Sequence, residues 1–163
     1  GGVDVSDPDG ERIRAKRPKP GLMRQHLTCV RAAAALCDAV VTGDEIGSTR
    51  LTFEPGVPRA GDYHFAIGTA GSTMLVLHTV LPVLMLADAP STITLEGGTH
   101  NDRAPSADFM REVFAPQLAK LGPTLTLETQ RYGMYPAGGG LVHATISPTP
   151  RATTPETTSG TAS

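Results

Sequence analysis

DYHFAIGTAGSTMLVLHTVLP, at residues 62–82, is the stretch that decides the fold, because it predicts a strand, a tight turn and a helix in succession. We expect the strand over residues 63–68 and the helix over residues 71–87. Gly68 and Gly71 supply the turn between them. The apolar run of this helix is too short to cross a bilayer, so we expect a helix of the protein core and no membrane-spanning segment.

Strands and helices of the same kind continue to residue 147. Ser106 is a suitable N-cap for the next helix, and Gly122 marks its end. A strand, a helix and two further strands are expected, in that order, over residues 91–96, 106–121, 124–129 and 141–146. Residues 61–147 therefore predict one complete β-α-β-α-β-β unit, a four-stranded sheet packed on two helices.

An earlier part of the chain repeats part of this order. A strand, a helix and two strands are expected over residues 12–16, 22–37, 39–42 and 49–54. This order matches the later unit without its opening strand and helix. We therefore predict an α/β (α+β) fold of repeated β-α-β-α-β-β units, in which residues 12–56 form an incomplete first unit. Such a unit should expose an apolar sheet face and an unpaired edge, which would allow self-association.

The two ends of the chain are polar. Residues 1–11 consist largely of Gly, Asp, Ser and Pro, and residues 148–163 contain almost no apolar side chain. These compositions predict a disordered linker and a disordered tail. The start of the chain also lacks the charged and then apolar pattern of a signal peptide.

The composition is typical of a soluble globular protein. Hydrophobic residues make up 39% of the 163 residues and charged residues 18%, and the net charge is −2. Cys29 and Cys37 are separated by about 12 Å along the predicted helix, which is too far for a disulfide. We expect both to be buried thiols in a reducing compartment, and we expect the protein to be cytoplasmic.

Positive charge is concentrated in one short segment. Residues 12–24 hold six of the 14 Lys and Arg residues and no Asp or Glu. Arg14 and Arg17 are candidates for an anion pocket, because guanidinium groups suit phosphate oxygens and a helix N-terminus follows. The alternative is a solvated basic strand that protects a sheet edge.

Three glycine-rich stretches are further candidate sites. AIGTAGSTM, at residues 66–74, either cradles a phosphate on the backbone around Gly68, Gly71 and Ser72 or forms a plain turn with a serine cap. GGTHNDRAPSADF, at residues 97–109, places His100 and Asn101 in a loop after a strand, where ligand-binding groups often gather. His100 and Asp102 alone do not make a metal site, so we assign no metal ligand.

The third stretch is YGMYPAGGGLV, at residues 132–142. Its three consecutive glycines allow close approach of two backbones or positive φ angles. The alternative is a flexible hairpin loop, although such flexibility raises the entropic cost of folding.

Four stretches, in this order and at this spacing, resemble the RNA 3'-terminal phosphate cyclase family: RPKPGLMRQHL, DYHFAIGTAGSTMLVLHTVLP, GGTHNDRAPSADF and YGMYPAGGG. The likeness covers about residues 12–147, and YPAGGG is similar to the core of the family's signature. Members of this family fold as repeated β-α-β-α-β-β units with a smaller inserted domain later in the chain.

The resemblance implies a reaction and its ligands. In the family, a histidine attacks the α-phosphate of ATP, and AMP then passes to an RNA 3'-phosphate. The terminal 2'-hydroxyl displaces AMP and leaves a 2',3'-cyclic phosphate. ATP, a divalent cation (Mg or Mn) and an RNA 3'-phosphate end are therefore the expected partners. The implied phosphate-binding and nucleotide-binding residues are Arg14, Arg17, Gln25, His26, His78 and Pro105.

The sequence also departs from the family pattern. GGVDVSDPDG stands where the family has a QGEGGGQ-type segment with an acidic metal-site residue. None of the five histidines matches the nucleophile, which belongs to a later repeat, so we assign no catalytic residue. His78 replaces a frequent glutamine, and Tyr132 a frequent Arg or His. We expect an inactive or incomplete cyclase fragment, and the alternative is a non-catalytic cyclase-like RNA-binding protein. An enolpyruvyl transferase and an unrelated structural protein are weaker alternatives.

Overall fold

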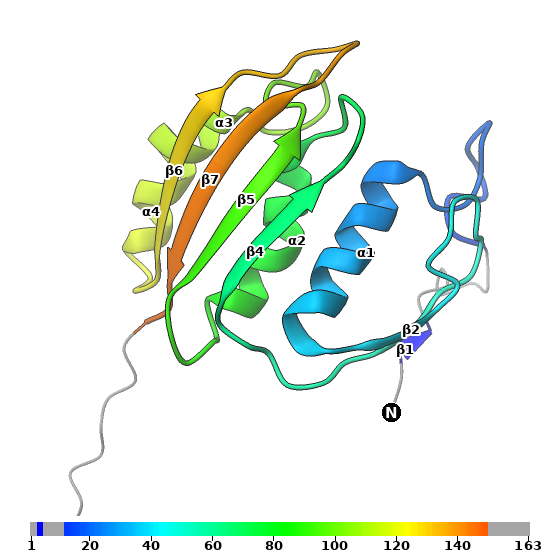
Figure 1. Ribbon diagram of the computed structural model, residues 1–163, viewed down its shortest axis with the longest axis horizontal. Coiled ribbons are helices and arrows are strands. Elements are labelled where there is room, and N and C mark those ends of the chain that lie inside the picture. The colour runs from blue at the N-terminus through cyan, green and yellow to red at the C-terminus, as the bar shows by residue number, and fades with distance from the viewer. Residues whose placement is uncertain (1–2, 5–11, 150–163) are drawn as a thin grey trace, which may run out of the picture.

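A four-stranded sheet forms the centre of the molecule in the computed structural model, which describes residues 3–4 and 12–149 (Figure 1). The strands lie in the order β4-β5-β7-β6. β4 and β5 are parallel, whereas β7 is antiparallel to both of its neighbours. The four strands are β4 (Asp62–Ala66), β5 (Ser91–Gly97), β6 (Thr124–Arg131) and β7 (Gly140–Ser147).

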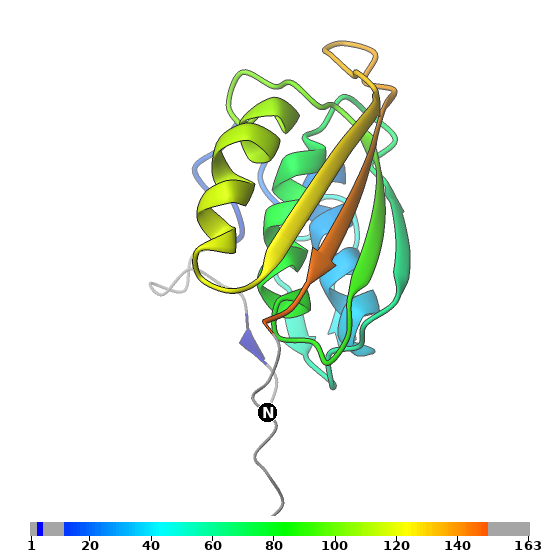
Figure 2. The same ribbon diagram turned by 90° about the vertical axis from the view of Figure 1, so that its left-hand side faces the viewer.

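The helices of this unit cover one face of the sheet (Figure 2). α2 (Thr73–Leu84) begins at Ser72, whose hydroxyl accepts a hydrogen bond from the Leu75 N–H at 3.3 Å. The second helical segment begins at Ser106 and consists of α3 (Ala107–Phe109), a π-helical turn η1 (Met110–Phe114) and α4 (Ala115–Ala119). The fold is therefore α+β, and the predicted order of strands and helices between residues 61 and 147 is confirmed.

Alternating burial along the strands builds the core. In β5, Ile93 and Leu95 are fully buried toward the helices, whereas the residues between them are more exposed. α2 contributes the apolar side chains that the sequence predicted for a core helix, and it contains Pro82 without ending there. The same core cluster includes Ala32 and Leu36 from an earlier helix. The two parts of the chain thus share one hydrophobic core.

The earlier part contains this helix and a small antiparallel sheet. α1 (Arg24–Cys37) lies alongside α2 in Figure 1 and packs against it. The sheet has the order β1-β3-β2 and consists of β1 (Val3–Asp4), β2 (Val40–Thr42) and β3 (Thr52–Glu54). The predicted helix and the two predicted strands after it are therefore confirmed, with shorter bounds. That this part is an incomplete copy of the later unit stays a prediction.

The predicted strand at residues 12–16 is wrong. These residues form turns, with hydrogen bonds from the Ala15 N–H to the Arg12 carbonyl at 2.9 Å and from the Arg17 N–H to the Arg14 carbonyl at 3.0 Å. Arg14 has a φ of +54°, a left-handed conformation that no strand residue adopts. Its guanidinium Nη1 donates to the carbonyls of Lys19 and Gly21, both at 2.9 Å, which offsets this conformation.

The linker and tail predictions fall largely outside the described residues. β1 is the exception, because Val3 and Asp4 pair with β3 within the segment that the sequence assigned to the linker. Val40 of β2 and Ile46 of the loop after it are exposed apolar residues of the first part. The exposed apolar sheet face and self-association stay predictions.

Both cysteines are free thiols. Cys37 is buried as expected, whereas Cys29 is only half-buried. Burial raises the pKa of the Cys29 thiol. Among the described residues, the helices are all too short or too polar to cross a membrane.

Glycines allow three loops to cross at one end of the central sheet. A Cβ atom on Gly97 would lie 2.8 Å from the Gly71 carbonyl oxygen, and one on Gly133 would lie 2.3 Å from both Gly140 N and the Gly97 carbonyl oxygen. We call Gly71, Gly97, Gly133 and Gly140 the glycine crossing. It explains why these residue types recur in the three glycine-rich stretches, since any side chain would push the backbones apart.

Replacing Gly133 with alanine should destabilise the fold by about 3 kcal/mol, because the added methyl group meets only backbone atoms that cannot move aside. Gly139→Ala is the matched control in the same loop. Gly139 has a φ of +71° but open space around its Cβ position, so we expect a loss of only about 1 kcal/mol. Urea unfolding followed by circular dichroism measures both. Equal losses for the two variants would contradict the crossing.

Candidate functional site

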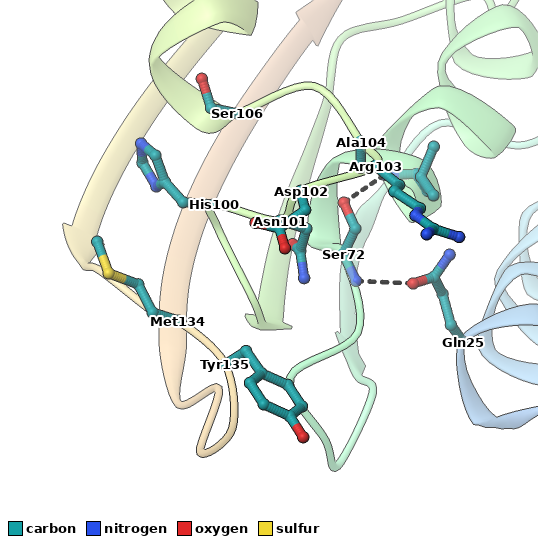
Figure 3. A pocket seen from close by; sticks show the side chains of 11 residues that line it. Gln25, Ser72, His100, Asn101, Asp102, Arg103, Ala104, Ser106, Met134 and Tyr135 are labelled. Atoms are coloured by element: carbon teal, nitrogen blue, oxygen red, sulfur yellow. Dashed lines mark hydrogen bonds between the residues drawn. The ribbon is translucent and has the colours of Figure 1, made fainter.

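A cavity of about 840 Å³ lies beside the glycine crossing (Figure 3). Its walls come from α1, the start of α2, the loop between β5 and α3, and the loop between β6 and β7. We call it the loop cavity, and its lining residues are Gln25, Ser72, Leu75, His100, Asn101, Asp102, Arg103, Ala104, Ser106, Met134 and Tyr135. It brings together four of the residues singled out in the sequence, namely Gln25, Ser72, His100 and Asn101.

Gln25 connects α1 to the start of α2. Its side-chain oxygen Oε1 accepts a hydrogen bond from the Ser72 N–H at 2.8 Å. Other N–H groups of this turn also have protein acceptors, since Gly71 donates to Thr69 Oγ1 at 3.3 Å and Thr73 donates to the Gly98 carbonyl at 2.9 Å. The structure therefore has the serine-capped turn, and a phosphate on this backbone would compete with these bonds.

Thr99, which precedes His100 of the cavity wall, joins the loop after β5 to the loop after β6. Its buried hydroxyl accepts a hydrogen bond from the Gly133 N–H at 3.0 Å, and its own N–H donates to the Gly133 carbonyl at 2.8 Å. The same hydroxyl lies 3.0 Å from His100 Nδ1. Thr99 is central to the site, although it had not been singled out in the sequence. In the sequence, its position between two glycines and His100 could have indicated a role in the site.

His100 is paired with Asp108 and not with Asp102. His100 Nε2 lies 3.1 Å from Asp108 Oδ2, and the other carboxylate oxygen of Asp108 accepts from Arg111 Nη2 at 2.8 Å. The ring of His100 packs against Tyr132, with 5.3 Å between ring centroids. Asp108 escaped the sequence analysis because it lies inside the next helix, where acidic residues are common for electrostatic reasons alone.

Asn101 and Arg103 each carry a polar group of the loop cavity that has no hydrogen-bond partner among the described residues. Asn101 Nδ2 donates to the Ala70 carbonyl at 2.7 Å, whereas its Oδ1 is buried and without a hydrogen-bond partner among the described residues. The exposed guanidinium of Arg103 makes no hydrogen bond or ion pair within the described part of the chain. A buried polar atom without a partner destabilises a fold, so Asn101 Oδ1 is suited to a ligand that donates a hydrogen bond.

A second, smaller hollow lies between α1 and α2. This helix groove has a volume of about 480 Å³ and is mostly apolar, with lining residues Ile13, Leu22, Gln25, His26, Cys29, Val30, Leu51, Leu75, His78 and Thr79. It contains His26 and His78, which the sequence singled out, and Gln25 lines both hollows. His26 Nδ1 accepts a hydrogen bond from the Met23 N–H at 3.3 Å at the start of α1.

Five further candidates from the sequence lie outside these two hollows. Arg14 bonds its own loop through Nη1, and Arg17 is exposed. Pro105 is not part of the cavity wall, although its neighbours Ala104 and Ser106 are. Gly68 has a φ of +71° and lines a separate hollow of about 220 Å³ with Gly139. The fifth, Gly71, belongs to the glycine crossing.

The described residues do not offer a ligand set for a divalent cation. Within residues 3–4 and 12–149, no three His, Cys, Asp or Glu side chains gather as they would around a metal ion. The donors present around the loop cavity therefore do not fit a cation held by this part of the chain, and we assign no step to one.

Comparison with known proteins now identifies the relationship. The sequence model of a family described as "RNA 3'-terminal phosphate cyclase" matches residues 11–158, which is most of the chain. The chain belongs to the RNA 3'-terminal phosphate cyclase family. The resemblance inferred from the four sequence stretches is thus confirmed.

A curated relative agrees with this assignment. The chain is 60% identical over 138 residues to a protein named RNA 3'-terminal phosphate cyclase from Ralstonia nicotianae. The match covers 85% of this chain and 40% of that cyclase. The chain therefore spans less than half the length of this cyclase, and the residues that line the loop cavity and the helix groove lie within the segment that the family match covers.

Acidification should destabilise the protein through His26 and His78. Burial lowers the pKa of both below the ordinary 6.5, and the charge of Arg14 lowers that of His26 further. Below pH 6.5 the unfolded state therefore binds more protons than the folded state, so the contribution of these residues is complete above pH 6.5 and is lost as the pH falls toward their folded pKa values.

Urea midpoints at pH 7.5, 6.5 and 5.5 measure this dependence. The double variant H26Q/H78Q should lose less stability between pH 7.5 and pH 5.5 than the wild type. An equally large loss in the double variant would show that other groups cause the effect.

Proposed function

We propose that this chain binds the 3'-phosphate end of an RNA in the loop cavity, as part of an RNA 3'-phosphate cyclase. The supporting observation is the gathering of Gln25, Ser72, His100 and Asn101 around one cavity, beside the guanidinium of Arg103, which has no partner in the described part of the chain. A guanidinium donates paired N–H groups that match phosphate oxygens. Family membership supplies the substrate class.

ATP belongs to the same proposal. In the family reaction, ATP adenylylates an enzyme histidine, AMP passes to the RNA 3'-phosphate, and the 2'-hydroxyl displaces AMP to give the 2',3'-cyclic phosphate. The residues of this chain would bind and orient phosphates. Arg14 and Arg17 retain their implied role, because Nε and Nη2 of Arg14 have no acceptor among the described residues while Nη1 holds the loop.

A non-catalytic RNA-binding role is the second candidate. Four of the five histidines have a ring nitrogen engaged with a protein group: His26 with Met23, His64 with Glu96, His100 with Thr99 and Asp108, and His143 with Thr94. The remaining one, His78, has a buried Nε2 without a partner among the described residues. None of these histidines has the position that the family's nucleophile would require, so no covalent step is assigned to this chain.

Binding of RNA ends tests the proposal. Fluorescence anisotropy with a labelled single-stranded RNA should show tighter binding of the 3'-phosphate form than of the 3'-hydroxyl form. Arg103→Ala should weaken binding of the 3'-phosphate form about tenfold, because a charge-assisted hydrogen bond is lost. Arg50→Ala removes an equal charge from an exposed residue outside the loop cavity and should have little effect. Equal binding of the two RNA forms would contradict the proposal.

Adenylylation tests whether this chain itself performs the first chemical step of the family reaction. The full 163-residue chain is incubated with ATP labelled at the α-phosphate and with Mg²⁺ or Mn²⁺, and the protein is examined for an acid-labile AMP adduct. We expect no adduct, because none of the five histidines matches the family's nucleophile, which belongs to a later repeat of the family fold. An adduct would instead show that the chain itself performs the first chemical step, and single His→Gln variants would then identify the residue.

A further inference from the structure

Tyr135 has no visible role in the stability of the fold. Its side chain is 86% exposed, the highest exposure of any large apolar or aromatic residue in the described part of the chain. Its hydroxyl makes no hydrogen bond there, and its ring makes no aromatic contact. An aromatic ring that stays exposed to water does not give the folded state the stabilising free energy that its burial would provide. This exposure therefore needs another explanation.

The loop that carries Tyr135 is held firmly at both ends. Met134 and Gly138 form an isolated antiparallel bridge, in which the Gly138 N–H donates to the Met134 carbonyl at 2.7 Å. Gly138 lies against the backbone of Thr69 and Ala70, so a Cβ atom there would come within 2.8 Å of both. The backbone that carries the ring is thus held by contacts on both sides of Tyr135. Little backbone conformational entropy therefore remains to be lost when a ligand contacts the ring.

The ring stands at the edge of the loop cavity. Figure 3 shows Tyr135 below Ser72 and Asn101, with its hydroxyl turned away from the other side chains drawn. The cavity wall also contains Asn101 and Arg103, and neither Asn101 Oδ1 nor the Arg103 guanidinium has a partner within residues 3–4 and 12–149. A flat apolar ring at the rim and polar groups inside match the two chemical parts of a nucleotide, the base and the phosphate.

We infer that Tyr135 stacks on the base of the terminal nucleotide of a single-stranded RNA 3' end, while its 3'-phosphate faces Arg103. This inference rests on the proposed function and names the recognition element for the RNA. The exposed position at the rim favours a polymer end over ATP, because the preceding nucleotides of an RNA must leave the cavity toward solvent. Every base has a π face, so the contact tolerates any terminal base.

The experiment compares an intact RNA end with one that lacks its terminal base. Two single-stranded RNAs carry a 3'-phosphate, and one of them has an abasic terminal nucleotide. Tyr135→Ala should bind the intact RNA about tenfold more weakly than the wild type does, and should bind the abasic RNA equally well, since the stacking partner is already missing. Tyr135→Phe keeps the ring and should bind both RNAs like the wild type.

Controls keep the result interpretable. Val57→Ala changes another exposed apolar residue. Val57 is 77% exposed and is not part of the loop-cavity wall, so this variant should leave RNA binding unchanged. Because Tyr135 is exposed, its variants should melt like the wild type, and circular dichroism verifies this. Affinity for ATP should be the same in Tyr135→Ala and in the wild type.

Three outcomes would overturn the inference. An equal loss on intact and abasic RNA, a loss for ATP without a loss for RNA, or unchanged RNA binding in Tyr135→Ala would each show that the ring does not stack on the terminal base. If the wild type does not distinguish the 3'-phosphate RNA from the 3'-hydroxyl RNA, the proposed function itself fails, and this inference fails with it. The wild-type measurement therefore separates the two failures.

Discussion

The hydrogen bonds between Thr99 and Gly133 are the contact on which the rest of the site depends. They join two loops that are 34 residues apart in the chain, and both the backbone and the hydroxyl of Thr99 take part. Because these hydrogen bonds are short, the backbones of the two loops must lie in contact. Only glycines allow this approach at the surrounding positions. Thr99 is fully buried, so its hydroxyl bonds without competition from water.

This contact determines what the neighbouring side chains can do. Because Thr99 is fixed, His100 is directed toward Asp108 and Tyr132, and Asn101 is directed toward the Ala70 carbonyl. The polar groups that remain unbonded then face one cavity. The site is preorganised by backbone packing, which leaves its backbone little freedom to lose when a ligand binds.

The sequence predicted the central unit well, for clear physical reasons. Ile93 and Leu95 alternate with polar residues, and Ser72 and Ser106 cap helices at the expected positions, so local signals agree with the tertiary structure there. The segment around Arg14 was predicted wrongly because its conformation depends on a guanidinium that bonds carbonyls five and seven residues away. The alternation of apolar and polar residues along a sequence gives no information about such a hydrogen bond.

The site was predicted only in part, for a similar reason. Gln25, Ser72, His100 and Asn101 stood out because of motif and loop position, and they do share a cavity. Asp108 and Tyr135 did not, since their significance comes from neighbours distant in sequence or from exposure, and neither property is visible in a single sequence. The pairing of His100 with Asp108 and not with Asp102 is decided by the start of a helix.

The packing of α1 against α2 has a consequence for how the chain can be divided. Ala32 and Leu36 belong to the same cluster as the α2 and sheet residues, although the segment at residues 55–61 between them has the Pro and Gly content of a boundary. The boundary of the predicted repeat is therefore not a boundary of the hydrophobic core. Cutting the chain there would expose apolar side chains of both pieces that are now buried. Because Ala32 and Leu36 are buried in the same cluster as the α2 and sheet residues, we expect the two segments to unfold together.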